Sequence, residues 1–292
     1  MLALKIVVLV HARDDQFETS RSTVELLMHQ WREMGASVEV VRGIDRFVEA
    51  DLLVPHVNLT VVPPEYVEFM TQYPKVVNRH MLDISKSKIS SHLVRRGDAY
   101  RGPVIVKTDR NYGGKPEKRL IGDATVARPR SRLGRLLSSP ARDAARAWRY
   151  RADLNPINYP IFDSLDDVPA GVFKNPHLVV EKFLPEVDDD GYCLRTWVVF
   201  GDRGLSRLSR SRDRIVKASN VIHREEVPVP DGLRKIREDL KADFAKLDYV
   251  IRDGEVVLFD VNRTPTGYGG ESPSEEALKN ARMIAEGIYS MR

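Results

Sequence analysis

Apolar runs and helical spacing alternate over the first 78 residues. Residues 5–11 are an apolar run typical of a buried strand, and residues 22–35 place apolar side chains at helical spacing, with Gly35 as the stop. This alternation continues and predicts a Rossmann-like α/β domain at residues 1–78, with a small parallel sheet. The remaining predicted elements of this domain are strands at residues 37–41, 51–54 and 76–78 and a proline-opened helix at residues 63–72.

The pattern changes from about residue 79, which we take as the start of a second domain, residues 79–292. A charged helix is predicted at residues 83–95, and the strand VIVK at 104–107 runs into a polar turn with two glycines, TDRNYGG. An arginine-rich insert follows at about residues 126–152. Further predictions are strands at residues 178–184 and 192–201, a helix that follows Pro230-Asp231-Gly232 and runs to about Ala245, and a final helix that Ser272, Pro273 and Glu275 cap. With both domains the fold class is α/β in the broad sense, or α+β.

The segment LDYVIRDGEVVLFDVNRTP, residues 247–265, reads as two apolar strands joined at Asp253-Gly254. Alternation along the second strand predicts that Val256, Leu258, Asp260 and Asn262 share one face. The position of Asp248 depends on the turn. A two-residue loop pairs Asp248 with Phe259 and turns it away, whereas a three-residue loop with Gly254 in the left-handed conformation pairs Ile251 with Glu255 and brings Asp248 to the face of Asp260.

Two carboxylates and one amide oxygen at Asp248, Asp260 and Asn262 suit a hard divalent cation. Magnesium in particular takes one or two carboxylates and leaves its other positions to water and substrate phosphates. The alternative is an ordinary amphipathic hairpin with acidic ends, because a DG turn between apolar strands is common. The pattern of this segment alone leaves the two interpretations open.

The amino-acid composition is typical of a soluble protein. The chain has 292 residues, of which 42% are hydrophobic and 30% charged, with a formal net charge of +4 and one cysteine. No apolar run approaches the roughly 20 residues that span a bilayer. Lys5 interrupts the apolar N-terminus, so we read it as a first strand rather than a signal peptide, and we predict a cytoplasmic protein with no membrane partner. A homo-oligomer is compatible with this composition.

Two features bear on anionic partners. The arginine-rich insert between Arg128 and Arg151 contains one acidic residue, Asp143, and is compatible with binding phosphate or an anionic polymer. Arginine-rich segments of this kind are more often solvent-exposed loops and helix faces. No aromatic stacking motif accompanies the arginines, so we do not expect a nucleic-acid partner. The segment after the first strand, HARDDQFETS, lacks the glycine fingerprint of a dinucleotide site.

Three separate sequence segments indicate a nucleotide-binding site. Lys107 ends a buried strand beside the glycine turn, which places an ammonium and backbone N–H groups against phosphate oxygens. The strand Glu181-Lys182-Phe183-Leu184 then runs into a proline and offers backbone groups to a base edge, although a plain edge strand has the same sequence. The hairpin at residues 247–265 is the third segment, because its acidic side chains could hold a magnesium ion on those phosphates.

The order of these pieces resembles the ATP-grasp superfamily, to which D-alanine:D-alanine ligase, glutathione synthetase and biotin carboxylase belong. EKFL and DVNRTP carry the resemblance, which covers the chain from about Asn78 to its end. It implies a two-lobed ATP-grasp domain at residues 79–292, with residues 1–78 as the preceding domain that those enzymes carry. ATP and Mg²⁺ are the implied cofactors, and Mn²⁺ is a possible substitute.

The resemblance also implies roles for particular residues. Lys107, with Gly113 and Gly114, matches the phosphate-binding lysine and turn, while Glu181, Lys182 and Leu184 match the adenine hinge. Either Glu186 or Asp188 takes the place of the acid on the ribose hydroxyls. Asp248, Asp260 and Asn262 match the magnesium ligands, although the family more often has Glu where Asp260 stands. The remaining matches are Lys86 and Lys217 as further phosphate contacts, Lys246 near the transferred phosphoryl group, and Arg195 and Arg263 near the carboxylate substrate or acyl phosphate.

The implied chemistry is the joining of a small-molecule or peptide carboxylate to an amine through an acyl phosphate. A kinase with the same fold, or a nucleotide-binding module without ligation, is the alternative. Both use the same metal and lysine positions, so these positions do not separate them. His56, His80 and His223 are interpreted as structural or surface residues.

Overall fold

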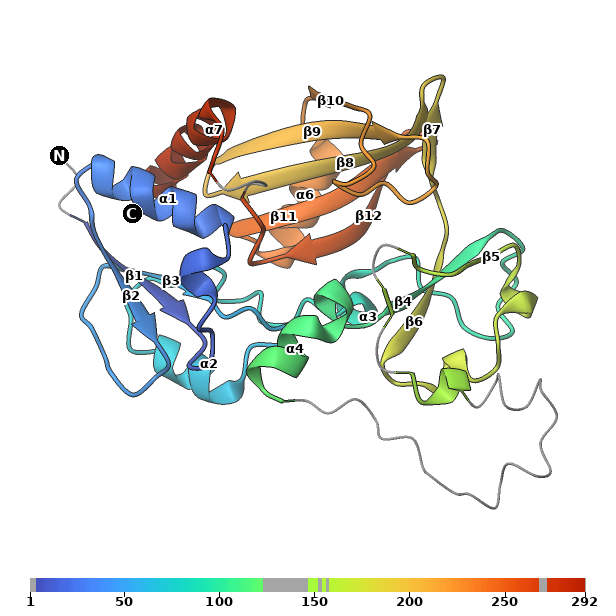
Figure 1. Cartoon of the computed structure of the whole chain (residues 1–292), viewed down its shortest axis with the longest axis horizontal. Coiled ribbons are helices and arrows are strands. Elements are labelled where there is room, and N and C mark those ends of the chain that lie inside the picture. Colours follow the sequence, from blue (N-terminus) through green and yellow to red (C-terminus); the bar gives the residue numbers. More distant parts are fainter. Residues whose placement is uncertain (1–3, 123–146, 152–153, 156–157, 268–271, 292) are drawn as a thin grey trace, which may run out of the picture.

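The computed structural model describes residues 4–122, 147–151, 154–155, 158–267 and 272–291. These described residues form three sheets (Figure 1). Most of the predicted arginine-rich insert, residues 126–146 and 152, lies outside the described residues. Within the described part of the chain, no helix combines the length and apolar character needed to cross a membrane.

The N-terminal sheet is parallel, as the alternating pattern predicts. Its central strand β1 (Lys5–Val10) lies between β2 (Ser37–Arg42) and β3 (Leu52–His56). The helix α1 (Thr23–Glu33) begins where the Ser22 side chain accepts a hydrogen bond from the Glu25 N–H, and it buries Val24, Leu27 and Trp31. The second helix of this region is α2 (Pro64–Met70), and a short 3₁₀ turn lies at Phe17–Thr19.

The predicted fourth strand at residues 76–78 is reduced to one parallel bridge between Leu53 and Val76. Extended backbone ends there because Asn78 takes a left-handed conformation, with φ 57°.

A small antiparallel sheet has the order β5-β4-β6, with β4 (Val104–Thr108) between β5 (Ile161–Phe162) and β6 (Leu178–Lys182). The helix predicted before it is wrong in length, since α3 covers only Lys86–Ile89. Residues 92–94 are extended instead, because Lys182 N–H donates to the His92 carbonyl and Val94 N–H to the Val180 carbonyl, along the edge of β6. Short turns precede β6 at Leu165–Asp167 and Val172–Lys174.

The largest sheet is antiparallel, with the order β10-β9-β8-β11-β12, and β7 pairs with β8. The prediction missed three of its strands, β7, β9 and β10. It was right about β8 and about the hairpin of β11 and β12. The strands are β7 (Glu186–Asp188), β8 (Gly191–Phe200), β9 (Arg203–Ser211), β10 (His223–Glu226), β11 (Phe244–Arg252) and β12 (Glu255–Asn262).

Two helices pack against this sheet (Figure 1). The helix α6 (Asp231–Leu240) is shorter than predicted because Lys241 takes a left-handed conformation and Phe244 begins β11. The helix α7 (Glu275–Ala285) starts later than predicted: Ser274, not Ser272, accepts the capping hydrogen bond, from the Ala277 N–H. A 3₁₀ segment, η6 (Glu286–Met291), follows α7.

One core cluster joins the N-terminal sheet to the largest sheet. It combines Val8 and Trp31 with Phe200, Phe244 and Ile288, all of them buried. The first 78 residues therefore pack against the strands that follow, and the domain boundary at residue 78 stays a prediction.

Asn78 provides a polar connection at the same place. Its Nδ2 donates to the Phe244 carbonyl at 2.7 Å, and its Oδ1 accepts from the N–H groups of Asp243 and Phe244 at 2.8 and 3.0 Å. The side chain is buried, so these bonds satisfy backbone groups that water does not reach. Asn78 therefore fixes the start of β11, the strand that leads to Asp248.

We expect Asn78→Ala to lower the free energy of unfolding by about 2–4 kcal/mol, because buried backbone groups lose their partners. Urea unfolding measures the change. Asn78→Gly tolerates the positive φ and also lacks the side chain, so it should be destabilised too. If Asn78→Gly were as stable as the wild-type protein, the loss of stability in Asn78→Ala would come from backbone conformation and not from the lost hydrogen bonds.

Candidate functional site

The turn of the β11–β12 hairpin has two residues, so the three-residue loop on which the shared face of Asp248 and Asp260 was expected to depend is wrong. Arg252 pairs with Glu255, and Asp253 and Gly254 both have positive φ, at 52° and 83°. Two left-handed residues are the signature of a type I′ turn, which matches the twist of the flanking strands. By itself this turn places Asp248 on the face away from Asp260.

A β-bulge reverses that outcome. Tyr249 pairs with Leu258, but Asp248 pairs with Asp260, so Phe259 is an extra residue in β12. The extra residue shifts the alternation by one position. Leu258 consequently turns to the core with Tyr249, contrary to the prediction that it shares a face with Asp260. Asp248 and Asp260 lie directly opposite each other on the other face.

The same face carries Lys246 and Asn262, which form the next opposed pair of the hairpin. Lys246 Nζ lies 3.0 Å from Asp248 Oδ1, and Asn262 Oδ1 accepts the Thr264 N–H at 2.9 Å. The predicted magnesium ligands and Lys246 therefore form one block of side chains on adjacent strands.

Lysines from three other segments surround this block. Lys86, on α3, lies with its Nζ 3.2 Å from Asp260 Oδ1. Burial lowers the pKa of Lys86, but attraction by Asp260 and neighbouring groups outweighs burial, and the net pKa is raised. For Lys217 the balance is opposite: burial lowers its pKa although Asp248 and Asp260 attract the ammonium. Attraction by Asp248 is the largest effect on Lys246 and raises its pKa.

Lys107 connects the small sheet to the hairpin. Its Nζ lies 2.6 Å from Glu181 Oε2, and it also lies 5.1 Å from the centre of the Phe259 ring. The bulge thus has a second consequence, because the extra residue Phe259 contacts the lysine that ends β4. A cation over an aromatic face gains about 0.5–2 kcal/mol, depending on its desolvation.

Three carboxylate oxygens in this region are buried and have no hydrogen-bond partner among the described residues: Glu181 Oε1, Asp248 Oδ1 and Asp260 Oδ1. The last two have only a lysine ammonium close by, at 3.0 and 3.2 Å. These ion pairs compensate part of the carboxylate charge, and the carboxylate oxygens are also the hard ligands that a divalent cation prefers.

The donors at this site fit magnesium rather than a soft metal. Two carboxylates and the amide oxygen of Asn262 are hard ligands, and they leave positions for water and phosphate. Among the residues with described coordinates, no group of three or more His, Cys, Asp and Glu side chains is placed to hold a metal ion. The site therefore lacks the ligands of a closed structural zinc centre.

Gly113 and Gly114 follow β4 in the turn η2 (Asn111–Gly114), which leads into α4 (Lys115–Leu120). Their φ angles are 72° and 74°, and Tyr112 before them has φ 47°. Consecutive left-handed residues explain why glycine occupies two of the three positions. The left-handed backbone of this turn therefore agrees with the tight turn that its two glycines indicate.

Arg263 holds loops together and does not face the carboxylates. Its guanidinium donates to the carbonyls of Met81, Leu59 and Thr60, at 3.1, 2.6 and 3.1 Å. Burial lowers the pKa of Arg263 to about 10. Thr60 Oγ1 in turn accepts the N–H of Asn111, at the start of the glycine turn, at 2.9 Å. Arg263 therefore connects the end of β12 to the glycine turn.

Arg195 lies away from the cluster. It pairs with Tyr249, whose side chain faces the core, and it binds Glu186 in a bidentate ion pair with a shortest distance of 2.7 Å. Glu186 Oε2 also accepts the Ile251 N–H at 2.7 Å. Asp188, the other predicted ribose acid, binds Arg210 at 2.7 Å, and this hydrogen bond lowers the pKa of Asp188.

The predicted adenine hinge follows β6. Lys182 lies on the face opposite Glu181, with its Nζ 5.3 Å from the centre of the Tyr100 ring. Its N–H donates to the His92 carbonyl, and the Phe183 N–H donates to the Pro103 carbonyl at 2.8 Å. Leu184 comes directly after these bonds, where the backbone leaves the sheet.

Sequence reasoning missed Tyr159. This buried tyrosine lies beside Thr108, with 3.4 Å between the two hydroxyl oxygens, and burial raises its pKa. Lys86 and Asp260 are near enough to influence that pKa as well. Tyr159 stands in the irregular sequence NPINYP before β5, so no periodicity or motif points to it.

No family model matches the sequence, and no curated protein matches it. Among solved structures the chain is similar to D-alanine–D-alanine ligase from Bacillus anthracis, with a TM-score of 0.53 and 11% identity over 99% of this chain and 97% of that one. The same enzyme complexed with ATP gives a TM-score of 0.50 and 12% identity over the same shares. The likeness is one of fold, and it confirms the ATP-grasp resemblance at that level.

Asp260→Asn should lower the free energy of unfolding by about 3 kcal/mol, because it leaves the Lys86 ammonium buried without its partner. Asp248→Asn should cost less than about 1 kcal/mol, since Lys246 is 32% exposed and water can hydrate it, whereas Lys86 is 3% exposed. Chemical unfolding compares the two variants. Adding Lys86→Met to Asp260→Asn should recover most of the loss, and equal costs for the two single variants would contradict this account.

Proposed function

We propose that the chain is an ATP- and magnesium-dependent ligase that joins a carboxylate to an amine through an acyl phosphate. The observation that carries the proposal is the opposed pair Asp248 and Asp260, with Lys86 and Lys246 bound to it and Lys217 within electrostatic reach of both carboxylates. The ATP-grasp fold supports the use of ATP, because one of the similar structures is complexed with ATP.

Asp248, Asp260 and Asn262 are the residues that we expect to hold Mg²⁺, or Mn²⁺ in its place. Like charges directly opposite each other on a sheet destabilise it, and a divalent cation held by these residues would compensate them. When bound, the ion would neutralise charge at the phosphate oxygens of the nucleotide. Asp260 is shorter than the Glu that is usual in the superfamily, and its position opposite Asp248 still brings both carboxylates to one place.

The lysines provide positive charge for the phosphates. Lys107 lies beside the glycine turn, and Lys86 and Lys217 lie near Asp260. We expect these three ammonium groups, with backbone N–H groups of Gly113 and Gly114, to contact ATP phosphates. Ammonium groups fixed in a buried site stabilise developing charge strongly because they need no reorganisation.

We expect the base and sugar of ATP to bind at the end of β6 and just after it. Glu181, Lys182 and Leu184 are proposed as the adenine hinge, with backbone contacts to the adenine edge from Glu181 and Leu184. We prefer Asp188 as the ribose ligand because it is exposed at the end of β7, whereas Glu186 is partly buried and bound by both Arg195 and the Ile251 N–H. Asp188 also has an ion-pair partner, Arg210, and a ribose hydroxyl pair would share the carboxylate with it.

In the proposed reaction a carboxylate oxygen of the first substrate attacks the γ-phosphorus, and ADP leaves. The amine then attacks the acyl carbon, the phosphate leaves, and a proton departs from nitrogen. Lys246 is placed beside Asp248 to neutralise the transferred phosphoryl group. Arg263 acts as a positioning residue, since its guanidinium is bound by three backbone carbonyls.

Mg-ATP at about 100 times its dissociation constant should stabilise the protein by about 2.7 kcal/mol, which raises the melting temperature by roughly 6–10 °C. Asp248→Asn should lose the magnesium-dependent part of this shift. Asp253→Asn is the matched control, because Asp253 is 89% exposed at the turn of the same hairpin. A full magnesium-dependent shift in Asp248→Asn would remove the metal assignment.

Ligation and phosphorylation give products of different mass. With ATP and a mixture of candidate acids and amines, we expect a product lighter by one water than its two parents, together with ADP and phosphate. Mass spectrometry detects it, and omission of the amine should abolish it. A phosphorylated product that needs no amine would instead identify a kinase.

A further inference from the structure

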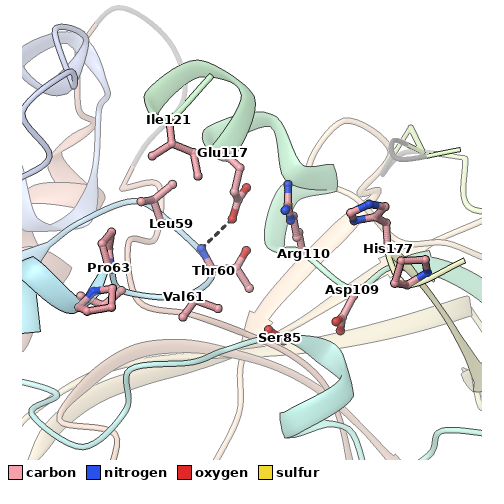
Figure 2. A pocket seen from close by; sticks show the side chains of 13 residues that line it. Leu59, Thr60, Val61, Pro63, Ser85, Asp109, Arg110, Glu117, Ile121 and His177 are labelled. Atoms are coloured by element: carbon pink, nitrogen blue, oxygen red, sulfur yellow. Dashed lines mark hydrogen bonds between the residues drawn. The ribbon is translucent and has the colours of Figure 1, made fainter. Parts of the chain in front are cut away.

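A cavity of about 440 Å³ lies beside the proposed ATP site and outside it (Figure 2). Its lining comes from the loop after β3, from the ends of α3 and β4, from α4 and from the segment before β6. None of the proposed phosphate or metal ligands lines it. Ser85 and Arg110 do, and they adjoin the Lys86 side chain, whose Nζ lies 3.5 Å from the Arg110 carbonyl.

One wall of the cavity is apolar and the other is charged. Leu59, Val61 and Ile121 belong to the apolar wall, and Val61 and Ile121 are among the exposed large hydrophobic residues of the protein. The opposite side carries Asp109 and Arg110 (Figure 2). Ligand pockets of about 300–1,000 Å³ combine mostly apolar walls with a few polar groups in this way.

Glu117 is the unusual member of the lining. It is 4% exposed, and Figure 2 shows its carboxylate between Leu59 and Arg110, directed toward Thr60. Its Oε1 accepts the Thr60 N–H at 2.8 Å, but its Oε2 is buried and has no hydrogen-bond partner among the residues that the structure describes. An unpaired buried carboxylate oxygen is costly, so a donor to the Glu117 carboxylate is strongly favoured.

The other carboxylate of the lining is already satisfied. Asp109 Oδ1 accepts the Ser87 N–H at 2.7 Å, and its Oδ2 lies 2.9 Å from the Ser87 hydroxyl. With Asp109, Glu117 and Arg110 charged, carboxylates exceed cations in the lining. A neutral alcohol supplies one donor, whereas an ammonium supplies three donors and a positive charge.

We infer that this cavity binds a small molecule with a primary ammonium group and an aliphatic body. The ammonium pairs with the Glu117 carboxylate, which lines the cavity, and the aliphatic part lies against Leu59, Val61 and Ile121. This site is separate from the proposed ATP and metal ligands, so the inference goes beyond the proposed function. The bound group adjoins α4 and the glycine turn before it, because Thr60 accepts from Asn111 as well as donating to Glu117.

The test uses leucinamide and N-acetyl-leucinamide, which share the aliphatic body and differ in the ammonium. Titration calorimetry or ligand-observed NMR should show binding of leucinamide to the full chain at least tenfold tighter than binding of the acetylated compound. Equal binding of the two compounds, or no binding of leucinamide, overturns the inference.

Glu117→Gln locates the site, because the glutamine oxygen still accepts the Thr60 N–H while the negative charge is lost. We expect at least a tenfold loss of leucinamide binding, and no loss in Glu68→Gln, an exposed control on α2. Ile121→Trp fills the cavity and should also abolish binding. Both variants should keep the Mg-ATP stabilisation, which separates this inference from the proposed ligase. Undiminished binding in Glu117→Gln or Ile121→Trp would refute the site.

Discussion

The repulsion between Asp248 and Asp260 is the constraint on which the rest of the site depends. Two carboxylates directly opposite each other on adjacent strands destabilise a sheet unless positive charge compensates them. Lys86 and Lys246 each bind one of the pair, and Lys217 is drawn to both. Because Lys86 is almost fully buried on α3, this compensation also fixes the segment between the N-terminal sheet and β4 against the hairpin.

The same bulge that opposes the two aspartates connects two sheets. Phe259 is the extra residue, and its ring lies under the Lys107 ammonium at the end of β4. Lys107 in turn binds Glu181 of β6, and Arg263 just beyond β12 holds the Thr60 loop that contacts the glycine turn. One local irregularity therefore aligns the proposed metal ligands with the proposed phosphate ligands.

Local patterns predicted the elements but not the pairing between them. The strands β1–β3 and the helix α1 follow from apolar spacing, with a Ser cap and a Gly stop at the ends of α1. The hairpin turn was predicted with the wrong length, and Asp248 and Asp260 still share a face because of a bulge that alternation does not encode. Arg195 was matched by its order in the chain, yet strand pairing turns it toward the core. The ion pairs of Lys86 and the place of Tyr159 depend on contacts between segments distant in sequence, which no local pattern reports.

The most direct test of the central claim is electron paramagnetic resonance of Mn²⁺ with a non-hydrolysable ATP analogue. Wild-type protein should give a protein-bound Mn²⁺ signal that depends on the analogue, because in the proposed site Asp248, Asp260 and Asn262 hold the ion together with the phosphates. Asp248→Asn should give the signal of the free Mn²⁺–nucleotide complex. An identical bound signal from both proteins would contradict the account.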